Sequence, residues 1–227
     1  APMVEFTVLA FTPAGLCLPD LAIAACRAGG VGVVNGELQA ESAAIRRALD
    51  AVSAATAAPY GVKLDAIDAE LDAALRAHAA RGLSWLVVDA ELVPVHAALI
   101  GELRAAGVKV LAEVTTPEWP GAALDGDVDG LLLKGNEAGG FVGEDASFIL
   151  LQKWRGRTSL PLYVRGGITP HVAAACSAIG VAGGVLESQL LMFDEARLPT
   201  SLHSVLANLS GSETVAVNAP KGAAAKG

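Results

Sequence analysis

The sequence predicts an α/β protein, a single (β/α)8 TIM barrel, and three observations lead to that fold class. Short apolar runs alternate with longer helical patterns along the chain, which is typical of βαβ units. The chain holds eight such units, and this number favours a closed barrel over the alternative, an open doubly wound sheet. The length of 227 residues suits one barrel and is short for two ordinary domains.

Each expected strand is a continuous apolar run, as in a parallel sheet that is buried on both faces. These runs are rich in Val and Leu, and Gly, Pro or polar residues separate them from the helical segments. In chain order, the strands are expected at residues 6–11, 31–34, 60–64, 85–88, 108–114, 130–133, 162–165 and 183–186.

The segments between the strands show the signals of helices. Several begin at a proline and several end at a glycine, the residues that favour these two positions. The first helix is expected from Pro19–Asp20 to Gly29–Gly30, and the second over about residues 40–55. The others are expected around Leu71, Leu75 and His78, around Val95, Leu99 and Leu103 up to Gly107, from near Pro117, from Phe148 to Trp154, from Pro170 to Gly180, and from Leu198 to Leu209.

Composition excludes several classes of protein. The net charge of −8 argues against a nucleic-acid partner, which would need a basic face. No apolar run is long enough for a transmembrane helix, and residues 1–5 do not resemble a signal peptide. Three cysteines without paired spacing indicate reduced thiols, so we expect a cytoplasmic protein. The barrel domain is expected over residues 1–209, and residues 210–227 read as a flexible linker or tail.

In a barrel of this kind, function resides on the loops that follow the strands. The loop after the sixth expected strand carries Lys134 and Glu137, which are candidate catalytic residues because charges at a barrel mouth are costly unless they are used. Its glycines Gly135, Gly139 and Gly140 allow the backbone to approach a flat ligand closely. The alternative interpretation is a flexible loop without a function.

Two further loops are candidates for binding phosphate. Gly166 and Gly167 precede a helix, so their backbone N–H groups and the helix dipole would attract an anion, although an ordinary tight turn has the same pattern. After the eighth expected strand, Ser188 offers a hydroxyl, whereas the negative charge of Glu187 is unfavourable for phosphate.

Other polar residues are expected at the same end of the barrel. Lys63, Asp89 and Glu113 lie near the ends of their strands, where a salt-bridge network is as reasonable as catalysis. His78 lies within a helical pattern and is expected at the surface. No metal site is expected, because no pair of histidines has the spacing of ligands.

Several segments resemble the nitronate monooxygenases and the related flavin-dependent enoyl-acyl carrier protein reductases. The most specific is Lys134-Gly135-Asn136-Glu137-Ala138-Gly139-Gly140, and residues 21–32, 59–64 and 165–168 support it. The resemblance covers about residues 5–195. It implies a barrel that binds flavin mononucleotide (FMN), with the flavin ring over the strand ends near Lys63 and the phosphate between the loops of Gly166–Gly167 and Ser188.

A narrower resemblance concerns the carboxy-terminal part. Residues 184–191 and 209–215 are similar to barrel domains at the start of multidomain polyketide or polyunsaturated fatty-acid synthases. This resemblance implies a role in polyketide or fatty-acid synthesis. The expected partners are an acyl thioester or acyl carrier protein and the other domains of a megasynthase, with no nucleic acid and no membrane.

The chain departs from the pattern of this family at three site positions. Phe141 stands where the family has a catalytic histidine, Lys63 where it has a flavin-binding asparagine, and Glu187-Ser188 where it has Gly-Thr. Phenylalanine cannot transfer a proton, so we expect no efficient oxidation of nitronates. We also expect weak FMN binding or none, and stronger binding after Glu187→Gly.

Three hypotheses follow. The first is an FMN-dependent oxidoreductase, an enoyl-thioester reductase with NAD(P)H as electron donor, in which Lys134 and Lys63 stabilise negative charge. The second is a catalytically degenerate barrel with a structural or docking role. The third is an aldolase-like enzyme with Lys134 as Schiff-base nucleophile, ranked last because Glu137 would hold the lysine protonated.

Overall fold

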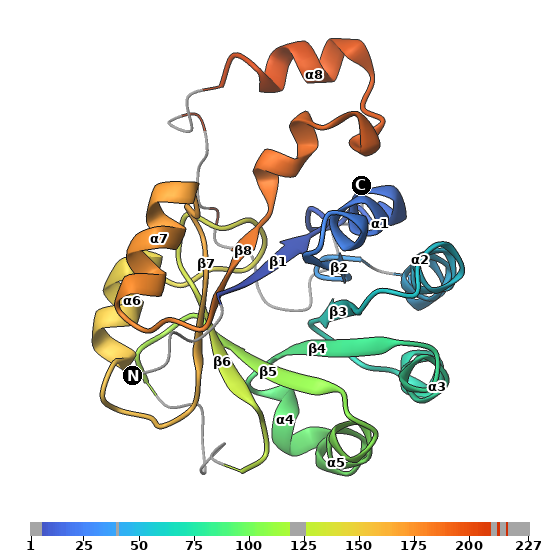
Figure 1. Cartoon of the computed structure of the whole chain (residues 1–227), viewed down its shortest axis with the longest axis vertical. Coiled ribbons are helices and arrows are strands. Elements are labelled where there is room, and N and C mark those ends of the chain that lie inside the picture. Colours follow the sequence, from blue (N-terminus) through green and yellow to red (C-terminus); the bar gives the residue numbers. More distant parts are fainter. Residues whose placement is uncertain (1–5, 40, 119–125, 210–212, 214–216, 218–227) are drawn as a thin grey trace.

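A computed structural model of the chain describes residues 6–39, 41–118 and 126–209, together with Glu213 and Val217. Eight parallel strands form a closed barrel in chain order, with β8 paired to β1, so the predicted fold class is confirmed (Figure 1). The strands are β1 Thr7–Phe11, β2 Val31–Asn35, β3 Tyr60–Leu64, β4 Leu83–Asp89, β5 Lys109–Val114, β6 Gly130–Lys134, β7 Leu162–Arg165 and β8 Gly183–Leu186.

The helices follow the strands on the outside of the barrel (Figure 1). They are α1 Pro19–Arg27, α2 Ser42–Ala55, α3 Ala69–Ala79, α4 Leu92–Val95, α5 Ala97–Ala105, α6 Ser147–Trp154, α7 Pro170–Ala178 and α8 Thr200–Leu206. Two short 3₁₀ helices, η1 Ser188–Met192 and η2 Asp194–Ala196, precede α8.

Three helix predictions need correction. The expected helix around Val95 is two helices, α4 and α5, with a break at His96 whose backbone leaves the helical conformation. The helix expected near Pro117 is absent from residues 115–118, and residues 119–125 lie outside the described part. The last helix, predicted from Leu198 to Leu209, is shorter at both ends, since α8 covers only Thr200–Leu206 and Pro199 occupies its N-cap. It stands apart from the other helices in Figure 1.

Two apolar layers hold the barrel together. The interior is filled by Leu, Val, Phe, Tyr and Trp side chains from the strands, among them Trp85 and Tyr163 in an edge-to-face contact. A larger cluster lies between the strands and the helices. Among the described residues the interior is therefore a packed core, so chemistry is expected at the ends of the barrel.

The linker or tail predicted over residues 210–227 falls outside the described residues, apart from Glu213 and Val217. In the part of the chain that the structure describes, none of the helices has the length and apolar character needed to span a membrane.

His78 is buried, which corrects the prediction that it lies at the surface. It sits near the end of α3, where the Tyr60 hydroxyl lies 2.8 Å from its Nδ1 and an oxygen of Asp50 lies 3.4 Å from its Nε2. These contacts lie beside Tyr60, the first residue of β3, at the barrel end opposite the strand ends that would carry function. Burial, and secondarily the charge of Arg81, lowers the pKa of His78.

We therefore expect the free energy of unfolding to fall on acidification below about pH 6.5, the ordinary pKa of histidine. The unfolded chain then binds a proton that buried His78 resists, so stability rises with pH across this window. Urea titrations at several pH values should show this slope. His78→Gln should reduce the slope, and His203→Gln on exposed α8 should leave it unchanged. An identical slope in His78→Gln would contradict the assignment.

Candidate functional site

Seven charged side chains gather where the barrel strands end, one from each of seven strands or from the residues just after them. Six of them are buried, and Asp89 is half-buried. Four carboxylates and three cations give the group one net negative charge. We call this group the charged layer; its members are Glu37, Lys63, Asp89, Glu113, Lys134, Arg165 and Glu187.

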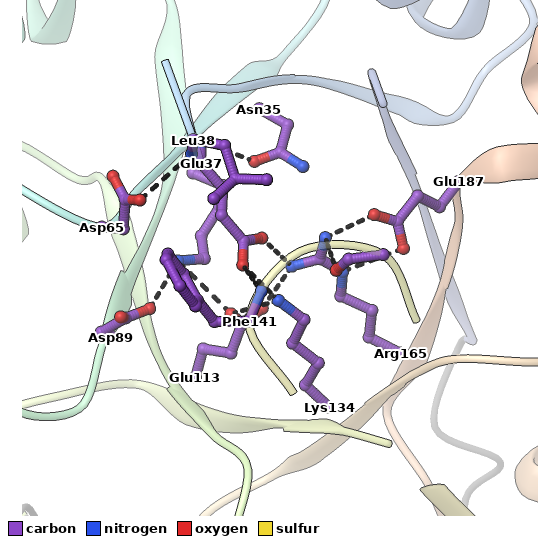
Figure 2. Close-up of polar contacts among 12 residues, drawn as sticks. Asn35, Glu37, Leu38, Asp65, Asp89, Glu113, Lys134, Phe141, Arg165 and Glu187 are labelled. Carbon is purple, nitrogen blue, oxygen red and sulfur yellow. Dashed lines mark hydrogen bonds and ion pairs between the residues drawn. The ribbon is translucent and has the colours of Figure 1, made fainter. Parts of the chain in front are cut away.

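Arg165, the last residue of β7, is the centre of the charged layer (Figure 2). Its Nε and Nη2 donate to the two carboxylate oxygens of Glu187, at 3.1 and 2.5 Å. Its Nη1 donates to Glu37 at 3.1 Å and to Glu113 at 2.7 Å. One fully buried guanidinium therefore joins three carboxylates from different parts of the barrel.

The two lysines complete the charged layer. Lys134 donates to Glu37 at 2.5 Å and lies 3.6 Å from Glu113. Lys63 donates to Asp89 at 2.6 Å and lies 3.3 Å from Glu113. Lys63, Asp89 and Glu113 therefore form a salt-bridge network, one of the two alternatives that the sequence left open for them.

Neighbouring charges keep Lys63 and Glu113 ionised. Burial alone lowers the pKa of Lys63, but the charges of Glu113 and Asp89 more than offset it and raise the pKa to about 12. Burial alone would raise the pKa of Glu113, yet Lys63 and Arg165 hold it well below its usual range. A Schiff-base nucleophile must be a neutral amine. Lys63 does not meet this requirement. The amine of Lys134 is engaged in an ion pair with the Glu37 carboxylate, so the structure does not present it as a free nucleophile.

The glycine-rich loop after β6 covers the charged layer. The backbone N–H of Phe141 donates to Glu37 at 2.7 Å, and the Gly139 carbonyl lies 3.4 Å from Nη2 of Arg165. Gly140 has a φ of +83°, and a Cβ there would overlap the Glu37 carboxylate. The glycines of this loop therefore accommodate the chain's own carboxylates.

Glu137 lies away from Lys134's partners, which corrects the expectation that it would hold the lysine protonated. Its carboxylate accepts the backbone N–H of Ser147 at 3.0 Å and lies 2.7 Å from the Ser147 hydroxyl. Ser147 is the first residue of α6, so the carboxylate stabilises the start of that helix. This contact is structural, and a catalytic role for Lys134 and Glu137 stays a prediction.

The two expected phosphate loops lie side by side. Gly166 and Gly167 have φ values of +115° and +63° and lead into α7, whose Thr169 caps the helix. Ser188 is exposed at the start of η1. The neighbouring Gln189 joins the loops, because its side chain donates to the Ile168 carbonyl and accepts the Glu187 N–H.

The residues at this end do not fit FMN in the arrangement seen here. The place expected for the flavin ring holds the charged layer and its covering loop. A Cβ on Gly166 would lie 3.2 Å from Glu137, so that carboxylate packs against the phosphate loop. The cavity beside Phe141 measures about 100 Å³. Ligand sites usually measure roughly 300–1,000 Å³.

Two features of the site were not predicted. Glu37 is a central member of the charged layer, and a charge two residues after the second strand was the available signal. Buried Asn35 accepts the Glu37 N–H with its Oδ1, while its Nδ2 has no partner among the described residues. Figure 2 shows this amide beside the charged layer. The described residues also contain no cluster of His, Cys, Asp or Glu suited to a metal ion.

Comparisons with known proteins agree with the fold. No family model matches the chain. A curated protein of Rhodococcus jostii (strain RHA1), (3aS,4S,5R,7aS)-5-hydroxy-7a-methyl-1-oxo-octahydro-1H-indene-4-carboxyl-CoA dehydrogenase, is 28% identical over 195 residues, which are 83% of this chain. The match covers 53% of that protein, so the chain spans about half the length of this relative.

Solved structures show the same architecture. FabK from Thermotoga maritima superposes with a TM-score of 0.76 at 22% identity, over 93% of this chain and 67% of that one. Nitroalkane oxidase from Streptomyces ansochromogenes gives a TM-score of 0.70 at 20% identity, over 90% of this chain and 71% of that one. At these identities the likeness establishes a shared barrel fold.

Proposed function

We propose that this chain is a barrel domain of the flavin-enzyme type, related to the enoyl-thioester reductases and nitronate monooxygenases, that serves acyl-thioester metabolism without flavin chemistry. Its role is structural or docking, beside the other domains of a polyketide or fatty-acid synthase. The relation is supported by the likeness to FabK and nitroalkane oxidase and by the resemblance of the loop after β6. The thioester context is supported by the relative whose name is that of a carboxyl-CoA dehydrogenase.

One observation carries the choice of a role without flavin. The charged layer lies under Gly139, Gly140 and Phe141, and all its cations are paired with carboxylates. A substrate or a cofactor would have to displace these pairs before it could reach Lys134 or Arg165. Buried ion pairs of this kind are costly to break, because each unpaired charge loses its compensation.

A second candidate function is that of an active FMN-dependent enoyl-thioester reductase with NAD(P)H as electron donor. The specific observation in its favour is the match over 83% of this chain to a dehydrogenase of a CoA thioester. In that case Lys63 and Lys134 would supply positive charge to a developing enolate. This role requires that the loop over the charged layer opens.

Turnover assays distinguish the two candidates. We expect no oxidation of NAD(P)H with crotonyl-CoA, with or without added FMN, and no oxygen consumption with small alkyl nitronates. Phe141 offers no proton-transferring group at the position where the loop meets Glu37. NAD(P)H-dependent reduction of crotonyl-CoA by the purified protein would establish the second candidate instead. Phe141→His is the matched variant for nitronate oxidation, and we expect it to stay inactive while the charged layer is closed.

A further inference from the structure

We infer that the ion pair between Arg165 and Glu187 keeps FMN out of the barrel mouth. This inference rests on the proposed function, because it explains how a barrel of the flavin-enzyme type came to work without flavin. The geometry that carries it involves the two neighbouring strands β7 and β8, whose loops would hold the cofactor's phosphate.

The first step of the argument is the position of Arg165. It directly precedes Gly166 and Gly167, and its side chain turns inward and is fully buried in the charged layer. The guanidinium also lies 5.1 Å from the ring of Phe11, so it packs on the apolar interior from above. A side chain of this size fills the space beneath the expected ring position.

The second step is the position of Glu187. The sequence indicates only that the negative charge of Glu187 is unfavourable for phosphate. In the structure this charge is paired, because Glu187 makes a bidentate contact with Arg165, at 3.1 and 2.5 Å, and is 7% exposed. The pair ties the residue after β8 to the last residue of β7, so both side chains occupy the barrel mouth beside the two phosphate loops.

The third step is charge. The charged layer has one net negative charge, and a phosphate monoester adds about −1.5 to −2 at neutral pH. The positive charge that would attract the phosphate is already neutralised, since Arg165 faces Glu37, Glu113 and Glu187. FMN is therefore excluded by filled space and by the lack of a free cation among the described residues at this end.

The test compares FMN binding by the unmodified protein and by Arg165→Ala/Glu187→Ala. This double variant removes one charge of each sign, so the net charge is unchanged while the space between β7 and β8 opens. Arg46→Ala/Glu70→Ala is the matched control, because it removes an exposed pair between α2 and α3 whose atoms are 2.9 Å apart.

We expect no binding in a flavin fluorescence titration for the unmodified protein and the control, and binding at least tenfold tighter for Arg165→Ala/Glu187→Ala. Circular dichroism establishes that each variant is folded. If the double variant does not fold, Glu187→Gly takes its place with the same expectation, because Arg165 keeps Glu37 and Glu113 as partners.

Two results would overturn the inference. One is stoichiometric FMN in the unmodified protein, and the other is a folded opening variant that binds FMN no more tightly than the control. These readouts measure binding alone. The proposed function fails separately, if the unmodified protein reduces crotonyl-CoA, so the two failures can be distinguished.

Discussion

Arg165→Ala is expected to lower the free energy of unfolding by about 3–5 kcal/mol, the usual cost of removing one partner from a buried ion pair. The substitution leaves Glu37, Glu113 and Glu187 without their common guanidinium. Lys134 and Lys63 can compensate only Glu37 and Glu113, so Glu187 loses its ion-pair partner among the described residues. In a chain of this length, the loss corresponds to a fall in melting temperature of roughly 6–20 °C.

Urea unfolding at neutral pH measures this effect, and Arg46→Ala is the matched control. Arg46 pairs with Asp50 and Glu70 at the surface, where its removal should cost less than about 1 kcal/mol. Arg165→Lys should recover only part of the loss, because an ammonium cannot reproduce the two-pronged contact with Glu187. Equal stability of Arg165→Ala and Arg46→Ala would show that the charged layer is not intact in solution.

Gly135→Ala is expected to destabilise the protein by about 3 kcal/mol or more, from overpacking and from lost hydrogen bonds to a charged group. A Cβ on Gly135 would overlap the Glu137 carboxylate and the backbone nitrogen of Ser147. The backbone at the start of α6 cannot move away without losing hydrogen bonds. The Ser147 N–H donates to Glu137, and the Ser147 hydroxyl donates to the Gly166 carbonyl at 3.1 Å. Thermal unfolding followed by circular dichroism measures the loss.

Gly139→Ala provides the control within the same loop. A Cβ there would lie 3.4 Å from Glu187, an ordinary contact, and Gly139 does not have a positive φ. Its stability should stay within about 1 kcal/mol of the unmodified protein. If Gly135→Ala were as stable as Gly139→Ala, the close approach of the loop after β6 to α6 would be wrong.

The closed charged layer also changes how the glycine-rich loop is interpreted. The sequence motif 134–140 indicated a loop that lets backbone approach a flat ligand. In the structure, Gly140 and Gly135 are needed because Glu37 and Glu137 occupy the space beside them. The same glycines thus serve internal packing, and a motif alone does not distinguish the two uses.

The sequence by itself determined the barrel and the end at which its charges collect. Alternating apolar runs and helical patterns are local properties, and closure follows from their number, since parallel strands must bury both faces. The strand-end positions of Lys63, Asp89 and Glu113 follow from the same register, because side chains at the ends of parallel strands converge.

Only the tertiary structure decided which charges pair. Glu37 and Arg165 are 128 positions apart, and Glu137 turns to α6 instead of Lys134. Such choices depend on the distances between residues in the folded chain. They also depend on the desolvation that closure of the barrel imposes on these charges, and local spacing in the sequence encodes neither.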